Sequence, residues 1–233
     1  MIRIEGVSHR YGDRTVLAGL TVDLDEPRVG VIGANGSGKS TLARLLNGLV
    51  LPTEGRVSVD GLDTRSDGGA VRRKVGFVFS DPDAQIVMPT VREDVEFSLR
   101  GKGLDRSDLD RRVAAALVAH GLADHADHPA HLLSSGQKQA LALASVLVLE
   151  PEVLVCDEPT TLLDRRHTRR VSALLESLPQ RVVLVTHDLE MVHGWDRVLV
   201  VDEGRIVADG AGAEVVPFYE RLMDGEPAER SGP

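Results

Sequence analysis

Residues 28–41 read Arg-Val-Gly-Val-Ile-Gly-Ala-Asn-Gly-Ser-Gly-Lys-Ser-Thr, an apolar stretch that runs into a glycine-rich loop. The stretch Arg28–Ile32 predicts a buried β-strand, and after Lys39 leucines recur at helical spacing. A strand, a glycine-rich loop and a helix in this order fit the pattern G-x-x-x-x-G-K-[ST], which binds nucleotide phosphates. We therefore interpret Gly33–Thr41 as a phosphate loop rather than an ordinary strand–helix turn.

This loop has a direct chemical rationale. Glycines allow a tight turn in which successive backbone N–H groups point at a phosphate, and the positive end of the following helix adds to the attraction. We expect Lys39 to reach the β- and γ-phosphates of ATP, Ser40 to bind Mg²⁺ and Thr41 to bind the α-phosphate. The remaining loop residues predicted to contact the nucleotide are Gly33, Ala34, Asn35, Gly36, Ser37 and Gly38.

Two acidic residues end a second apolar strand. Val153–Cys156 is followed by Asp157 and Glu158, and adjacent buried carboxylates need a compensating cation. We expect Asp157 to hold Mg²⁺ and Glu158 to orient or deprotonate the attacking water. His187 follows the apolar run Val182–Thr186, at the strand end where α/β sheets bind ligands, and is a candidate sensor of the γ-phosphate.

The order of patterns along the chain predicts its fold class. Short strands precede the phosphate loop, helical patterns dominate from about 81 to 150, and strand–helix alternation then resumes up to a hairpin at 198–208. This order favours an α/β fold with a parallel-sheet core, an N-terminal antiparallel β subdomain and an inserted helical subdomain. We expect a single domain over residues 1–223, with a core of 1–80 and 151–223, a helical subdomain of 81–150, and a flexible tail over 224–233.

Composition excludes several classes of protein. The net charge of −9 disfavours binding of nucleic acid over a broad face. The single cysteine, Cys156, forms no internal disulfide and favours a reducing compartment. The N-terminus has no signal-peptide pattern, and no stretch approaches the ~20 apolar residues needed to span a bilayer.

A third motif, Leu133-Ser134-Ser135-Gly136-Gln137, precedes a strongly helical stretch and resembles the signature loop of ABC ATPases. Along nearly the whole chain the order of motifs is similar to that family. Tyr11 resembles the aromatic residue that stacks on adenine, Asp164 the D-loop aspartate, and His187 the switch histidine. The resemblance implies the ABC ATPase fold, ATP and Mg²⁺ as ligands, and ATP hydrolysis coupled to transport.

The resemblance also implies a partnership. In this family two ATPase subunits, identical or homologous, pack head to tail, so that Ser134 and Gly136 of one chain would cap the ATP bound by Lys39 of the other. The helical subdomain would dock on an integral membrane subunit at the cytoplasmic face of the membrane. The chain would then be a peripheral membrane protein.

Two positions depart from the family pattern. Ser135 replaces a glycine of the signature loop, and Ser80 stands where the family places a glutamine that contacts Mg²⁺ and water. Gln85, five residues on, is assigned to the following helix instead. The departure at Ser135 predicts reduced turnover, and the one at Ser80 leaves a doubtful magnesium contact.

Residues 79–97 point to one branch of the family. Phe79-Ser80-Asp81-Pro82-Asp83-Ala84-Gln85-Ile86-Val87 and the segment Val91–Phe97 resemble ATPases of energy-coupling-factor importers, which add a substrate-binding membrane subunit and have an extra helix here. Gln85–Val91 is most similar to the biotin-importing members, while cobalt and nickel importers share most of these residues. A conventional ABC transporter subunit, a soluble mechanochemical ABC ATPase, and a P-loop kinase or GTPase are the alternatives.

A cluster of histidines and aspartates lies just before the signature loop. Asp124-His125-Ala126-Asp127-His128-Pro129-Ala130-His131 holds five potential metal ligands in eight residues. The favoured interpretation is a polar connector in which Asp127 or His128 caps a short turn. A Zn²⁺ or Ni²⁺ site is the alternative.

Overall fold

The structure is a computed structural model that describes residues 1–224. The described residues divide into two compact units, 1–72 with 181–224 and 73–180. The strands and helices of the first unit are β1 (Ile2–Tyr11), β2 (Arg14–Leu24), β3 (Arg28–Ile32), α1 (Lys39–Leu46), β4 (Glu54–Val59), β5 (Leu62–Asp63), β8 (Arg181–Val185), β9 (Arg197–Asp202), β10 (Arg205–Gly210) and α7 (Gly212–Met223). Those of the second are β6 (Val75–Val78), α3 (Val91–Ser98), α4 (Arg106–Ala119), α5 (Ser135–Leu147), β7 (Val153–Asp157) and α6 (Arg165–Ser177), and helix α2 (Gly68–Lys74) spans the division.

The first unit contains an antiparallel sheet with strand order β2-β1-β4-β5. Residues alternate between buried and exposed along β1, and Ile2 and Ile4 are fully buried because every second side chain faces the same side of a strand. Gly55, the second residue of β4, has a φ of 79°. A Cβ at this position would lie 2.4 Å from the carbonyl oxygen of Glu5. Only glycine permits this close approach of β4 to β1.

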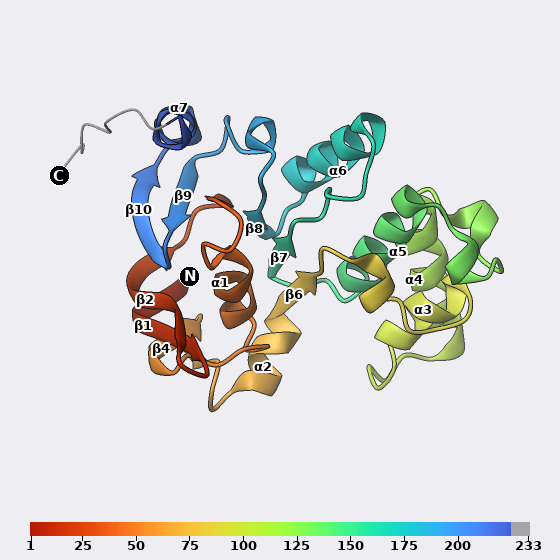
Figure 1. Cartoon of the computed structure of the whole chain (residues 1–233). Helices are drawn as coiled ribbons and strands as arrows, with labels where there is room; N and C mark the ends of the chain where they lie inside the picture. Colours follow the sequence, from red (N-terminus) through yellow and green to blue (C-terminus); the bar gives the residue numbers. More distant parts are fainter. Residues whose placement is uncertain (225–233) are drawn as a thin grey trace. The chain divides into compact units, whose positions relative to one another are not determined.

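The same unit contains parallel strands that place the glycine-rich loop. β3 pairs in parallel with β8 on one side and β9 on the other, and β10 returns antiparallel to β9. The four buried residues at the end of β3 leave no polar face, as expected for a central parallel strand. Helix α1 follows β3 and the loop (Figure 1). It buries Leu42, Leu45 and Leu46.

The second unit joins a short strand pair to a group of helices. β6 and β7 pair in parallel, from Val75 with Val153 to Val78 with Cys156. Helices α3, α4 and α5 lie together (Figure 1). Apolar side chains such as Val95, Leu117 and Leu141 are buried in their common core. Threonine and glutamate at the start of α3 form a capping box, which satisfies backbone donors that the first helical turn leaves free.

One buried carboxylate fixes the chain ahead of α3. Asp94 is 3% exposed and accepts hydrogen bonds from the backbone N–H groups of Val87 and Met88 and from the hydroxyl of Ser145 on α5. Burial without these donors would be costly, so the three bonds hold the segment before α3 against the helical core.

The predicted fold class is confirmed: parallel strands, an N-terminal antiparallel sheet and a group of helices are all present. The strand predicted over Arg28–Ile32 has these bounds in the structure. The extra helix expected near residues 81–97 is α3 with a short 3₁₀ turn, Pro82–Ala84, before it. The proposed single domain with a lobe at 81–150 stays a prediction, and residues 225–233 of the predicted tail lie outside the described residues.

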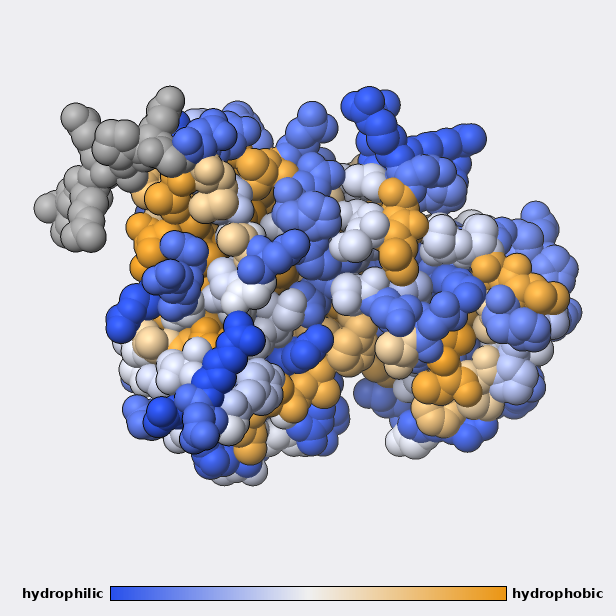
Figure 2. Space-filling view, viewed as in Figure 1, coloured by the Kyte–Doolittle hydropathy of each residue, from blue (hydrophilic) through white to orange (hydrophobic). Residues whose placement is uncertain are grey.

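No helix within residues 1–224 is both long and apolar enough to cross a membrane. On the face shown in Figure 2, hydrophobic and hydrophilic residues are interspersed.

Candidate functional site

The glycine-rich loop of the first unit adopts a backbone that side chains would obstruct. Gly33, Gly36 and Gly38 have φ of 149°, 79° and 109°, in the region that favours glycine. A Cβ on Gly33 would lie 2.0 Å from the carbonyl oxygen of Val201. The glycine at position 33 therefore lets the loop lie directly against the backbone of β9.

Lys39 lies folded back over this loop. It is 6% exposed, and its Nζ donates to the carbonyl oxygens of Gly33 at 2.8 Å and Ala34 at 2.9 Å. An ammonium group carries three donors and is strongly hydrated, so burial is tolerated only with such acceptors. Its position lets the same donors turn to the phosphate oxygens of a nucleotide.

The other predicted loop residues surround the lysine. Ser37 is 6% exposed, and its hydroxyl has no hydrogen-bond partner among the described residues. Thr41 is buried, Ser40 is half-buried, and Asn35 is exposed at the tip of the loop. A buried hydroxyl without a partner is uncommon in a folded protein, and a phosphate oxygen would supply one.

Two further predicted residues belong to the first unit. Tyr11 ends β1 with half its surface exposed, and its ring contacts His9 edge to face at 4.6 Å between centroids. The exposed half of the ring leaves apolar surface that could stack on a base. His187 is exposed just after β8, at the same end of the parallel strands as the phosphate loop after β3.

The predicted acidic pair ends β7 in the second unit. Asp157 is 1% exposed, whereas Glu158 is half-buried and has φ of 53°. That backbone conformation is unfavourable for a non-glycine residue and tends to occur where function requires it. It is followed by a turn in which Thr161 donates to the carbonyl oxygen of Glu158 at 3.2 Å.

These oxygen donors suit Mg²⁺. The cation prefers a few hard oxygen ligands and keeps its remaining waters, and a buried carboxylate such as Asp157 and a hydroxyl such as Ser40 are ligands of this kind. Burial raises the pKa of the neighbouring Cys156 thiol, and the charge of Asp157 raises it further. The thiol therefore stays protonated and takes no part in the site.

The predicted signature loop forms the start of α5. Ser134 is the N-cap of the helix: its hydroxyl accepts from the Gln137 backbone N–H at 3.3 Å, and the Gln137 side-chain oxygen accepts from the Ser134 N–H at 2.9 Å. This reciprocal capping box fixes the backbone while the side chains of Ser134 and Ser135 stay exposed. An exposed helix N-terminus attracts anions, so the loop offers a second place for a phosphate.

Gly136 and Asp164 approach the same histidine, which sequence reasoning did not single out. A Cβ on Gly136 would lie 2.3 Å from the ring of His167 on α6. Asp164 caps α6, accepting from the His167 backbone N–H at 2.8 Å and pairing with its Nδ1 at 2.9 Å. These bonds hold the pKa of the Asp164 carboxyl below its usual range. The only sequence signal was the three-residue spacing from a capping aspartate.

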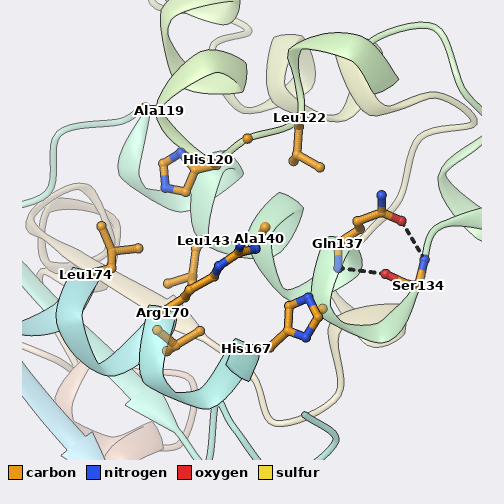
Figure 3. A pocket seen from close by; sticks show the side chains of 13 residues that line it. Ala119, His120, Leu122, Ser134, Gln137, Ala140, Leu143, His167, Arg170 and Leu174 are labelled. Atoms are coloured by element: carbon orange, nitrogen blue, oxygen red, sulfur yellow. Dashed lines mark hydrogen bonds between the residues drawn. The ribbon is translucent and has the colours of Figure 1, made fainter. Parts of the chain in front are cut away.

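A pocket of about 560 Å³ lies beside the signature loop within the second unit (Figure 3). Ser134, Gly136 and Gln137 form one side, and His167 and Arg170 extend into it from α6. Ala140, Leu143 and Leu174 form an apolar wall. The pocket combines a cation, hydroxyl and amide groups with the start of a helix, as an anionic ligand requires.

Ser80 and Gln85 bear on the missing glutamine of the family pattern. Ser80 is half-buried just after β6. Gln85 ends the 3₁₀ turn Pro82–Ala84, and its side chain accepts from the Phe79 N–H at 3.1 Å and donates to the Ala142 carbonyl at 3.0 Å. Both ends of that amide are used, so Gln85 is a structural bridge to α5 and does not replace the missing glutamine.

The cluster of histidines forms no metal centre in the described structure. Within residues 1–224, no three histidine, cysteine or acidic side chains are grouped to hold a metal ion. The segment is a connector built of two short 3₁₀ turns, Ala123–His125 and Ala130–Leu132. No cap by Asp127 or His128 is seen there; Asp127 instead pairs with Arg92 at 3.6 Å.

The sequence was then compared with known proteins. Residues 18–161 match the family described as ABC transporter. A putative ABC transporter ATP-binding protein of Deinococcus radiodurans is 51% identical over 96% of this chain and 99% of its own length. The biotin transport ATP-binding protein BioM of Rhizobium etli is 43% identical over 95% and 98%. The energy-coupling factor transporter ATP-binding protein EcfA1 of Symbiobacterium thermophilum is 44% identical over 94% and 82%.

Solved structures agree with these matches. The structure of cbiO1 from Clostridium perfringens, part of the ABC transporter complex cbiONQ, has a TM-score of 0.83 and 33% identity over 96% of this chain and 93% of that chain. A dimeric structure of the ATP-binding cassette MJ0796 in a post-hydrolysis state, bound to ADP and Pi, has a TM-score of 0.80 and 28% identity over 91% and 98%.

Proposed function

The chain belongs to the ABC transporter family of ATP-hydrolysing subunits, and we propose that it energises an importer of the energy-coupling-factor type, with biotin as the transported vitamin. The observation that carries the ATP-binding role is the phosphate loop, with its buried Lys39 bonded to two loop carbonyls. The similarity to BioM and EcfA1 over almost the whole chain supports the importer branch.

In this proposal each predicted residue has a role. Tyr11 stacks on adenine, Gly33–Thr41 bind the phosphates, and Glu158 acts as the general base. His187 senses the γ-phosphate. Asp157 and Ser40 would hold Mg²⁺, which when bound neutralises charge on the β- and γ-phosphates.

The proposal places the signature loop of a second ATPase chain on the nucleotide. Ser134, Gly136 and Asp164 would contact ATP that the partner's phosphate loop binds, and two ATP molecules would hold the dimer closed until hydrolysis releases it. The exposure of Ser134 and the dimeric state of the related cassette MJ0796 support this arrangement. The partner is a second copy or a homologous ATPase.

The membrane partners follow from the same branch. We expect an integral membrane coupling subunit and a small substrate-binding membrane subunit, with the chain bound peripherally at the cytoplasmic face and no nucleic acid involved. A cobalt or nickel importer, or a conventional ABC transporter, is the second candidate. The similarity to cbiO1, part of the ABC transporter complex cbiONQ, supports a role in an ABC transporter in either case.

One purification tests the proposal. The tagged chain is isolated from its host's membranes in mild detergent, with the Lys39→Ala variant as a control for ATP-dependent partners. Co-purification of a polytopic coupling protein and a small separate membrane protein that binds biotin supports the proposal. Recovery of a conventional permease, or of soluble partners alone, contradicts the importer branch.

A further inference from the structure

A pair of imidazole rings lies directly behind the signature loop. His125 and His128, which we call the histidine pair, have their Nδ1 atoms 2.8 Å apart. The Nε2 atom of His125 lies 2.8 Å from the side-chain nitrogen of Gln137. Gln137 is the residue whose side-chain oxygen accepts from the Ser134 N–H. The histidine pair, Gln137 and Ser134 therefore form one continuous chain of hydrogen bonds.

The chemistry of the donors fixes every proton in this chain. The Gln137 amide oxygen is used by Ser134, so its nitrogen faces His125 and can only donate. His125 must accept at Nε2, and its neutral ring then carries its proton on Nδ1. That proton is donated to the bare Nδ1 of His128, whose own proton lies on Nε2. Both rings must be neutral for all the bonds to exist.

The backbone that carries the histidine pair is well anchored. The carbonyl oxygens of Ala126 and His128 accept from the N–H groups of Arg92 at 2.8 Å and Val91 at 3.2 Å. The N–H of Ala130 donates to the Pro89 carbonyl at 2.8 Å, and Ala126 and Ala130 are buried in the helical core. The rings thus project from a fixed turn, and their contact with Gln137 positions the side chain rather than following it.

We propose that the histidine pair is a positioning device for the signature loop, which holds Gln137 in the orientation that keeps Ser134 ready for the partner's ATP. This inference rests on the proposed role of Ser134. An added proton disrupts the chain wherever it binds. A proton on His125 Nε2 would point at the Gln137 amide group, which also donates, so that hydrogen bond is lost. A proton on His128 Nδ1 would point at the proton on His125 Nδ1, so the bond between the rings is lost. If His125 shifts its own proton to Nε2 in response, Gln137 must rotate and Ser134 loses its acceptor.

The histidine pair is open to solvent. A cleft of about 250 Å³, lined by both histidines, Gln137 and Leu132, opens beside the rings, and His128 itself is exposed. The segments that contact the histidine pair carry these charged and titratable residues: Asp124, Asp127 and His131 on the same segment, Arg92 and Glu93 at the start of α3, and Lys138, which follows Gln137 and pairs with Asp83. Because both rings must be neutral for these hydrogen bonds to exist, protonation of either ring at acid pH breaks the hydrogen-bond chain.

ATP hydrolysis by the purified full chain, measured from pH 5.5 to 8.5, tests the proposal. In His128→Ala the acceptor is lost, and kcat should fall about threefold to tenfold at pH 8, with an unchanged KM for ATP. His128→Asn offers an amide oxygen near the position of Nδ1 and cannot take up a proton. It should restore kcat at pH 8 and remove most of the loss of kcat that the wild type shows at acid pH. His131 is a neighbouring exposed histidine that takes no part in these hydrogen bonds. The control variant His131→Asn should therefore show the wild-type dependence of kcat on pH.

Two results would overturn the proposal. One is a loss of kcat at acid pH in His128→Asn that equals the loss in the wild type. The other is a His128→Ala variant with wild-type kcat at pH 8. Nitrogen NMR of the histidine rings is the second measurement. It should find the Nδ1–H form of His125 and the Nε2–H form of His128, and any other pair of tautomers contradicts the hydrogen-bond chain. If the wild-type protein hydrolysed ATP no faster than Lys39→Ala, the ATPase role itself would be refuted. The NMR result would still decide whether the hydrogen-bond chain exists.

Discussion

The phosphate loop and the signature loop are both glycine-containing turns ahead of a helix, but they are held in different ways. In the phosphate loop Ser37 and Lys39 are each 6% exposed, and Gly33 lies against the backbone of β9. In the signature loop Ser134 and Ser135 are exposed, and Gly136 lies against a side chain, the ring of His167. The first loop is complete by itself, whereas the second is a fixed backbone with side chains directed at solvent. This difference supports the proposal that a second chain completes the site.

The largest expected effect comes from the buried lysine. In Lys39→Ala the phosphate loop keeps its shape but loses the cation, and turnover should fall by about a hundredfold or more, as when a preorganised donor is removed. ATPase activity and ATP binding, measured by calorimetry, check this. Arg44→Ala, on the same helix but outside the loop, is the control for general loss of charge. A Lys39→Ala chain with more than about a tenth of wild-type turnover would contradict the comparison.

One glycine-to-alanine variant in each loop compares how rigidly the two loops are held. In Gly33→Ala the new methyl meets a backbone carbonyl 2.0 Å away that cannot move, so unfolding should need roughly 3 kcal/mol less. In Gly136→Ala the methyl meets the His167 side chain, which can shift by giving up its exposed pair with Asp164, and alanine favours the helix, so stability should stay within about 1 kcal/mol. Urea unfolding measures both. Equal losses would mean that the two loops are held alike.

The sequence predicted the first loop better than the second. Arg28–Ile32 and the helix from Lys39 were predictable because a buried strand and an amphipathic helix leave clear patterns. Strand β5 and helix α2 were not predicted: β5 has two residues, and α2 buries only Val71, so neither has a periodic signal. The contacts of His167 and of the histidine pair depend on side-chain orientation across turns. Spacing along the chain does not contain that information.

Ser134 gives the third effect. Ser134→Ala removes the cap of α5, at about 1 kcal/mol, and the hydroxyl proposed to contact the partner's ATP. We expect kcat to fall roughly tenfold or more while the Kd of ATP for the isolated chain stays unchanged, because the phosphate loop alone binds ATP before closure. Steady-state kinetics and calorimetry separate the two quantities. A weaker Kd with normal kcat would place Ser134 in the chain's own ATP site.

The smallest effect is expected at the departure from the family pattern. Ser135 is the first residue of α5 and is exposed, so Ser135→Gly removes only a hydroxymethyl group. Turnover should rise by no more than about threefold, and stability should fall by less than about 1 kcal/mol because glycine is a poor helix former. Turnover and thermal unfolding measure the two changes. A rise above tenfold would mean that Ser135 crowds the partner's γ-phosphate.

In the proposed dimer, ATP joins the phosphate loop of one chain to the signature loop of another. Sedimentation of the Glu158→Gln variant tests it, because this change should keep ATP bound by removing the proposed general base. We expect a single species of 25.1 kDa without nucleotide, twice that mass with ATP, and no dimer when Ser134→Glu is added. If the Glu158→Gln chain binds ATP and stays at the mass of one chain, or hydrolyses ATP at the wild-type rate, the proposed ATP-bridged dimer is wrong.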